Sequence, residues 1–180
     1  AVDKWHHDTI PLDYVMMVSD PATLSGGGFE YFLGTKMEAA ELSKQGKTQP
    51  RDRVKAPKFP GPGYAVALHG NMVVHRGAPL KKPGERITMV NAYVSMDCLV
   101  DDQSRSRDLI GIDDPAALYA EWAKHASWRT QNRLQQIIDS MAFDQEPDQV
   151  LDQLEFAAND LLETINDMKA GPREAQHYEQ

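Results

Sequence analysis

The sequence predicts a mainly β fold over residues 1–100, followed by a helical region over residues 101–171 and a tail over residues 172–180. Up to about Ser95, short runs rich in β-branched and aromatic residues alternate with Gly, Pro and Asn turn signals. After Asp97 the composition changes to long stretches with helical periodicity. These two observations divide the chain into a β core and a set of C-terminal helices.

The β core is predicted from five runs of strand-forming residues. An insertion loop over residues 36–63 separates the first two runs from the last three: it begins with a short helix from Lys36 to Gly46 and continues in a Pro-, Lys- and Arg-rich stretch. The first two runs, joined by Gly-rich turn signals, resemble a hairpin. The expected strands are Thr9–Val18, Phe29–Leu33, Tyr64–His69, Met72–His75 and Glu85–Ser95.

Two helices are predicted after the β core. Asp114 followed by Pro115 is a typical helix start, and this helix should reach about Met141. The second should run from Pro147 to Gly171, where Gly followed by Pro is a stop signal. It carries one apolar seam, which we expect to pack on the chain's own sheet in preference to forming a homodimer through the helices. The seam residues are Leu151, Leu154, Ala158, Leu161, Ile165 and Met168.

Composition limits the classes of function. With 41% apolar and 26% charged residues, and no apolar run long enough to span a membrane, we expect a soluble globular protein. The formal net charge of −8 disfavours nucleic acid as a partner and favours a small-molecule substrate. Cys98 has no second cysteine to pair with, which predicts a small buried residue and a reducing, cytoplasmic location.

The most informative segment is His6-His7-Asp8. Residues i and i+2 of a strand project to the same side, so His6 and Asp8 should lie together while His7 faces away. They supply two ligands of the two-His-one-carboxylate triad that binds ferrous iron. His75 is the preferred third ligand, and His69, which precedes a turn, is the alternative.

Arg86 and Thr88 follow His75 along the chain. If His75 and Arg86 lie on adjacent strands of a small barrel, the Arg86 guanidinium faces the same cavity and can bind a carboxylate through two hydrogen bonds, assisted by the Thr88 hydroxyl. The Tyr14 hydroxyl is a further candidate carboxylate donor. Other candidate pocket residues are Glu30, Tyr31 and Asn91, with a basic stretch over residues 47–58 as a lid for an anionic substrate.

His-x-Asp, a distant His and then Arg-x-Ser/Thr, in this order and spacing, resembles the pattern of the Fe(II)/2-oxoglutarate-dependent oxygenase superfamily, including phytanoyl-CoA dioxygenase-like and clavaminate synthase-like members. The resemblance covers about half the chain, from Trp5 to Ser95. It implies a double-stranded β-helix, a cupin-like jelly roll. Because almost nothing precedes His6, we expect this barrel to be incomplete at its N-terminus.

The resemblance also implies a reaction. His6, Asp8 and His75 would bind Fe(II), and Arg86 with Thr88 would bind the distal carboxylate of 2-oxoglutarate, so that O2 is used to hydroxylate a small organic molecule with release of succinate and CO2. The alternative is a non-catalytic cupin-like protein that binds a metal or small ligand. An oxygenase acting on protein or nucleic acid is a third reading, which the acidic charge disfavours for nucleic acid.

Overall fold

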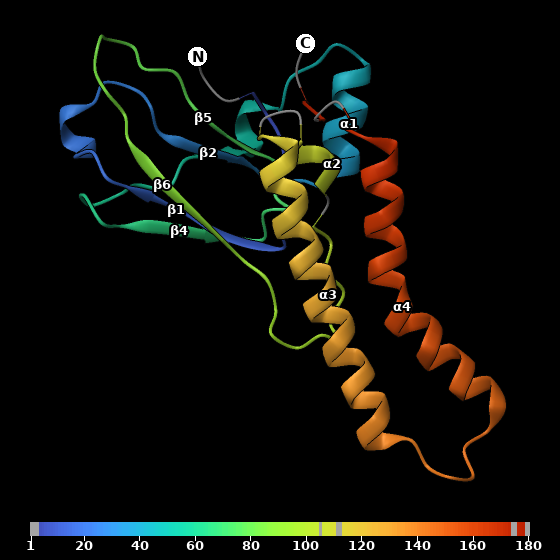
Figure 1. Cartoon of the computed structure of the whole chain (residues 1–180). Coiled ribbons are helices and arrows are strands. Elements are labelled where there is room, and N and C mark those ends of the chain that lie inside the picture. Colours follow the sequence, from blue (N-terminus) through green and yellow to red (C-terminus); the bar gives the residue numbers. More distant parts are fainter. Residues whose placement is uncertain (1–3, 105, 111–112, 174–175, 179–180) are drawn as a thin grey trace. The chain divides into compact units, whose positions relative to one another are not determined.

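The computed structural model describes residues 4–104, 106–110, 113–173 and 176–178 (Figure 1). It divides into two compact units, which are described separately below: unit 1 is residues 1–94 with 176–180, and unit 2 is residues 95–175. The predicted tail over residues 172–180 is therefore shared between the two units. Its residues 174–175 and 179–180 lie outside the described part of the chain.

Unit 1 contains two small antiparallel sheets (Figure 1). In one, the central strand β1 pairs with β4 and β6; in the other, the central strand β2 pairs with β3 and β5. The strands are β1 (Leu12–Met17), β2 (Phe29–Phe32), β3 (Val54–Lys55), β4 (Ala65–Leu68), β5 (His75–Gly77) and β6 (Thr88–Tyr93).

The fold is mixed, with two small sheets and C-terminal helices, where the sequence analysis predicted a mainly β protein. The described helices contain more residues than the described strands. The expected hairpin is wrong, since β1 and β2 belong to different sheets. Strand pattern reports which residues favour extended backbone but carries no information on which strand becomes the neighbour. The predicted strand Met72–His75 begins only at His75, because Met72 and Val73 form a turn that bonds to the His69 carbonyl.

The two sheets of unit 1 pack on each other through apolar side chains. Along β1 the burial alternates, and Asp13, Val15 and Met17 face inward. Val15 forms one buried cluster with Phe29 of β2 and Leu68 of β4, which joins one sheet to the other. This places the inner surface of both sheets around a shared core.

The opposite face of the β2 sheet has a core of its own. Helix α1 (Lys36–Lys44) starts at Thr35 in a capping box with Glu38 and buries Ala39. Ala39 packs with Trp5, Phe32, Val74 and Tyr178.

The predicted tail thus supplies a core residue, since Tyr178 is only 1% exposed and its backbone N–H donates to the Trp5 carbonyl. The predicted insertion loop is likewise more structured than expected. Besides α1 it contains the short 3-10 helix Arg51–Arg53 and strand β3, and its Phe59 packs against the inter-sheet core.

Unit 2 is helical, with α2 (Ser106–Leu109), α3 (Pro115–Ser140) and α4 (Pro147–Ala170). The start and end of both long helices agree with the prediction, and the Asp114 side chain caps α3. Helix α4 packs along α3 and buries Ala157, whereas much of its predicted apolar seam is exposed, with Leu151 at 57%. Burial of this seam on the chain's own sheet stays a prediction. Among the described residues, no helix is long and apolar enough to cross a membrane.

Candidate functional site

His6, Asp8 and His75 come together in unit 1, although His6 and His75 are far apart in sequence. The two histidines exchange both backbone hydrogen bonds, at 3.0 and 2.8 Å, and this bridge continues the β2 sheet beyond β5. The Asp8 backbone N–H donates to the Gly70 carbonyl at 2.8 Å, which fixes the chain two residues further on. Backbone pairing, and not the side chains themselves, therefore brings the three groups together.

The three side chains are close enough together to hold one metal ion between them. Asp8 Oδ1 lies 3.4 Å from His6 Nε2, and Asp8 Oδ2 lies 3.4 Å from His75 Nε2. One ligand atom from each residue falls within 4.8 Å of the other two. Ligand atoms about 2.1 Å from a metal and 90–110° apart lie about 3.0–3.4 Å from one another. The two carboxylate–imidazole separations lie at the upper end of this range, and they involve different oxygens of Asp8.

Both imidazole rings are held in the tautomer that a metal requires. His6 Nδ1 lies 2.7 Å from the Lys4 carbonyl oxygen, and His75 Nδ1 lies 2.9 Å from the Val73 carbonyl oxygen. A carbonyl only accepts, so in a neutral ring Nδ1 carries the proton and Nε2 carries the lone pair. Metal-ligating histidines are usually oriented in this way by a bond to the second nitrogen.

The pKa of the Asp8 carboxyl lies below its ordinary value. Burial would raise it, but the hydrogen bonds with His6 and Asp13 and the charges of the two histidines outweigh burial. Asp8 is therefore held as a carboxylate. A metal ion would take the place of the protons on the two Nε2 atoms, so that two nitrogen lone pairs and a carboxylate oxygen would face the same cation.

Asp13 is a residue of this site that the sequence analysis missed. It is 2% exposed and contacts Asp8, and burial, followed by the hydrogen bond to Asp8 and the charge of Asp8, raises its pKa to about 8. At neutral pH Asp13 is thus mostly protonated and can donate to the Asp8 carboxylate. An acidic residue at an inward position of the apolar strand Leu12–Met17 was the signal that could have found it.

His7 and His69 lie outside the ligand cluster. His7 faces away from His6, as its position in the strand predicts, and its Nδ1 lies 2.8 Å from the Tyr178 hydroxyl. His69 is exposed and directly follows β4, just before the turn over residues 70–72. Among the described residues, the group that could hold a metal contains His75 and neither of these two.

Arg86 lies in the segment just before β6. Its side-chain stem packs close to Gly27, and the neighbouring Ile87 is fixed to Ser19, whose hydroxyl accepts from the Ile87 N–H at 2.7 Å. The expectation that Arg86 and His75 lie on adjacent strands is wrong, because β5 belongs to the β2 sheet and β6 to the β1 sheet. The spacing between two strands in the sequence does not show whether they join the same sheet or different sheets.

Thr88 faces the inner surface and Tyr14 does not. Thr88 pairs with Met17, and opposite residues of an antiparallel pair share a face, so Thr88 lies on the same side as Met17 and Asp13. Tyr14 alternates with Asp13 and points to the outer face, where its hydroxyl accepts from Asn91 Nδ2 at 2.6 Å. The predicted role of Tyr14 as a cosubstrate donor, and of Asn91 as a pocket residue, is therefore not supported by their positions.

The other predicted pocket residues divide in the same way. Tyr31 pairs with His75 on β5 and packs against the inter-sheet core, on the inner side. Glu30 points to the other face, where it pairs with Arg76 at 2.8 Å, and Arg76 in turn stacks over the Trp5 ring. From the basic stretch, Arg53 bonds to the Leu33 carbonyl and to Glu38, an arrangement that fixes α1.

No protein-family model, curated protein or solved structure matches this chain. The chemistry of the site therefore rests on its own residues.

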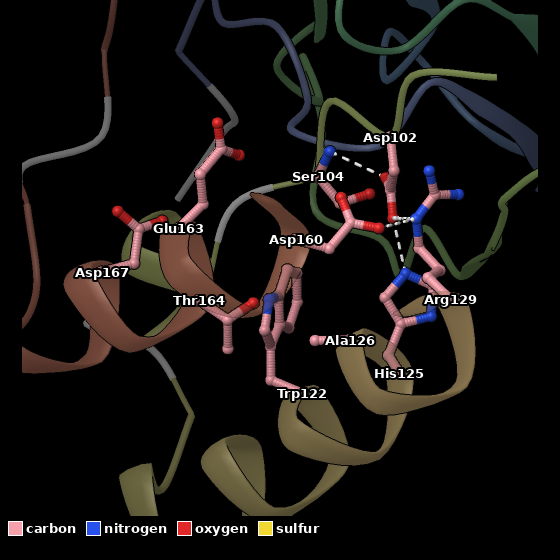
Figure 2. Close-up of a pocket in the computed structure, with 10 residues that line it drawn as sticks. All are labelled: Asp102, Ser104, Trp122, His125, Ala126, Arg129, Asp160, Glu163, Thr164 and Asp167. Carbon is pink, nitrogen blue, oxygen red and sulfur yellow. Dashed lines mark hydrogen bonds and ion pairs between the residues drawn. The ribbon is translucent and has the colours of Figure 1, made fainter. Parts of the chain in front are cut away.

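Unit 2 contains a second polar cluster, which surrounds a small cavity of about 30 Å³ beside α3 and α4 (Figure 2). His125 Nε2 lies 2.5 Å from Asp102, and Arg129 donates to Asp160 at 2.8 Å. Arg129 and Arg133 are almost fully buried. Both donate to the Cys98 carbonyl, and Arg129 also donates to the Val100 carbonyl. These bonds account for the buried arginines as structural groups that tie the segment after Ser95 to the helices.

Proposed function

We propose that unit 1 is a jelly-roll metal centre that binds Fe(II) through His6, Asp8 and His75 and acts as a 2-oxoglutarate-dependent oxygenase on a small organic substrate. The observation that carries the proposal is the convergence of two imidazole Nε2 atoms and one carboxylate, all within 4.8 Å. This donor set is typical of non-haem iron enzymes that keep coordination positions open for cosubstrate and O2.

The order of the strands supports the jelly-roll part of the proposal. The His6 segment, β2, β3 and β5 belong to one sheet, and β1, β4 and β6 belong to the other. In chain order the backbone therefore crosses between the two sheets after almost every strand. A chain that crosses repeatedly between two packed antiparallel sheets is characteristic of jelly rolls. The metal ligands then lie on the inner surface, next to the apolar core formed by Val15, Phe29 and Leu68.

The residues of the inner surface fit a bound oxoacid. Thr88 shares this surface with Asp13, and Arg86, two residues before it, brings a guanidinium to the same end of β6. Asp13 and Met17, the partner of Thr88, are four residues apart on β1, about 13 Å. Val15 lies between them on the same face, so a small dicarboxylate bound by Arg86 and Thr88 would pack against this apolar core.

Each candidate site residue then has a defined role. His6, Asp8 and His75 bind and orient the metal, Arg86 and Thr88 bind the carboxylate, and the apolar inner wall excludes water. When bound, iron and 2-oxoglutarate would supply the oxidising chemistry that hydroxylates a C–H bond.

The first test is anaerobic addition of Fe(II) and 2-oxoglutarate to the chain, followed by the visible charge-transfer absorption of the ternary complex. The parent should show the band, Asp8→Ala should lose it, and Arg86→Ala should require a much higher 2-oxoglutarate concentration. His69→Ala is the matched control, because it removes an exposed histidine that lies outside the cluster.

The outcomes separate the two functions considered. A folded parent that binds Fe(II) tightly, loses it in Asp8→Ala, and yet shows no band would contradict the oxygenase and support a non-catalytic metal-binding protein. A folded parent that binds no Fe(II), or binds it equally well in Asp8→Ala, would contradict the metal centre itself.

A further inference from the structure

An exposed apolar surface covers one side of the helical hairpin in unit 2. It is named the hairpin face here and consists of Leu134 and Ile138 on α3 and Leu151, Leu154, Leu162 and Ile165 on α4. These side chains are between 41% and 71% exposed. Single exposed apolar residues are common, but a contiguous patch of this size on one surface is typical of an interaction site.

On α3, three directions around the helix have different surroundings. Arg129 points toward the segment after Ser95, where it donates to the Val100 carbonyl at 2.8 Å. Ala126, which is buried, lies about 60° further round the helix, and Leu134 about 140° round in the same sense. The exposed apolar stripe of α3 therefore points away from the segment that covers the cavity.

On α4 the same three directions occur in the same sense of rotation. Asp160 points to the cavity and bonds to Arg129, as Figure 2 shows. The buried Ala157 lies about 60° further round, and Leu154 about 120° round. Because α3 and α4 are antiparallel neighbours, equal rotation away from the cavity brings both apolar stripes to one surface of the hairpin.

The hairpin face carries little charge. On α4, Asp160, Glu163 and Asp167 line the cavity on the other side of the helix. On α4, the helical period places Glu155 at the edge of the face and Lys169 one turn beyond Ile165. The two charged residues nearest the face on this helix therefore have opposite signs. The chain as a whole has a formal net charge of −8, which opposes self-association elsewhere on the surface. Because the hairpin face carries little charge, two copies can meet there without strong repulsion.

The size of the face also fits a dimer. On α3 the stripe continues toward the start of the helix through exposed small residues that lie in the same direction as Leu134 and Ile138, namely Ala116, Ala120, Ala123 and Ser127. Helix α4 has 24 residues and is therefore about 36 Å long, and two adjacent helices are about 20 Å wide. Such a face covers about 700 Å², so two copies would bury about 1,400 Å², which lies in the range of stable interfaces. Two flat two-helix layers packed face to face form a four-helix bundle, and a two-fold axis closes the assembly.

We propose that the hairpin face binds a second copy of this chain, so that α3 and α4 of two copies form a four-helix bundle. This proposal does not depend on the metal centre.

The test is sedimentation velocity of the full chain over a wide range of protein concentration. The parent should sediment as a dimer of twice 20.2 kDa. Ile138→Glu combined with Leu154→Glu should weaken self-association at least about 100-fold, because the added charges are buried in an apolar interface of an already acidic protein. Gln136→Glu combined with Gln149→Glu is the matched control, since both glutamines are exposed and point about 180° away from the face on the same two helices.

Far-UV circular dichroism checks that the helices of each variant are intact. If the Glu variant loses helicity, Ile138→Gln combined with Leu154→Gln replaces it, because glutamine keeps a good helix propensity. A parent that stays monomeric at every concentration would overturn the proposal and indicate that another surface covers the face. A dimer that the face variants leave unchanged would overturn it as well, by placing the interface elsewhere.

Discussion

Replacing Gly70 by alanine tests whether the close packing around Asp8 and Asp13 maintains the proposed metal centre. A Cβ at position 70 would lie 2.0 Å from Asp13 Oδ2, 2.9 Å from the Ile10 carbonyl oxygen and 3.0 Å from Asp8 Cβ. Atoms that are not bonded do not approach so closely, so Asp13 must move by more than about 1 Å, the difference from ordinary contact. Asp13 is buried and cannot simply rotate into solvent.

The expected cost follows from this geometry. Forcing one extra carbon into a well-packed region costs about 1–3 kcal/mol of unfolding free energy. For a unit of this size, a loss of about 1 kcal/mol lowers Tm by about 4–8 °C. The displacement also disturbs Asp8, whose backbone N–H donates to the Gly70 carbonyl, and we expect the affinity for Fe(II) to fall at least about tenfold.

The assay is thermal unfolding in the absence of metal, together with a direct titration of Fe(II) under anaerobic conditions. Gly61→Ala is the control, because a Cβ at position 61 meets no atom within 4 Å. A Gly70→Ala protein with the Tm and the Fe(II) affinity of the parent would refute the reasoning, since it would show that neither aspartate is held by this contact.

Three further predictions concern the rest of the chain. Tyr178→Ala should lower the unfolding free energy of unit 1 by about 3 kcal/mol or more, because a fully buried aromatic ring is lost, as urea unfolding would measure. Thr35→Ala should cost about 0.5–2 kcal/mol by removing the cap of α1, measured in the same way. Asp102→Asn should make the stability of unit 2 depend less steeply on pH in acid. Burial would raise the pKa of Asp102, but hydrogen bonds from His125 and Ser104 hold it below its ordinary value. A depressed carboxyl pKa stabilises the fold above the unfolded value of 3.8 and loses that contribution as pH falls further, so helix unfolding followed by circular dichroism below pH 3.8 should be less steep in the variant.

Each of these predictions has a control. Tyr178→Phe keeps the ring and loses only the hydroxyl bond to His7, so it should cost about 1 kcal/mol. Thr35→Ser keeps the capping oxygen and should be close to neutral. Asp148→Asn removes an exposed carboxylate of α4 and should leave the steepness of acid unfolding unchanged. If the control and the test variant behave alike in any pair, the contact assigned to that residue is not what stabilises the fold.

The sequence by itself determined the local features. Cap and stop residues located α3 and α4 closely, because Asp114, Pro115, Pro147 and Gly171 act through bonds and dihedral limits within one turn of the helix. The strand pattern located β1, β2, β4 and β6, since alternation reflects which side of one strand is buried. Alternation also placed His6 and Asp8 on one side and His7 on the other.

Only the tertiary structure decided which segments meet. His6 and His75 are brought together by pairing between distant strands, and Arg86 and His75 lie in different sheets, neither of which a local pattern specifies. Tyr178 enters the core of unit 1 although it follows a stop signal, because its burial depends on a surface made by Trp5 and α1. The role of Asp13 depends in the same way on Gly70, which lies next to it only after β1 and β4 have paired.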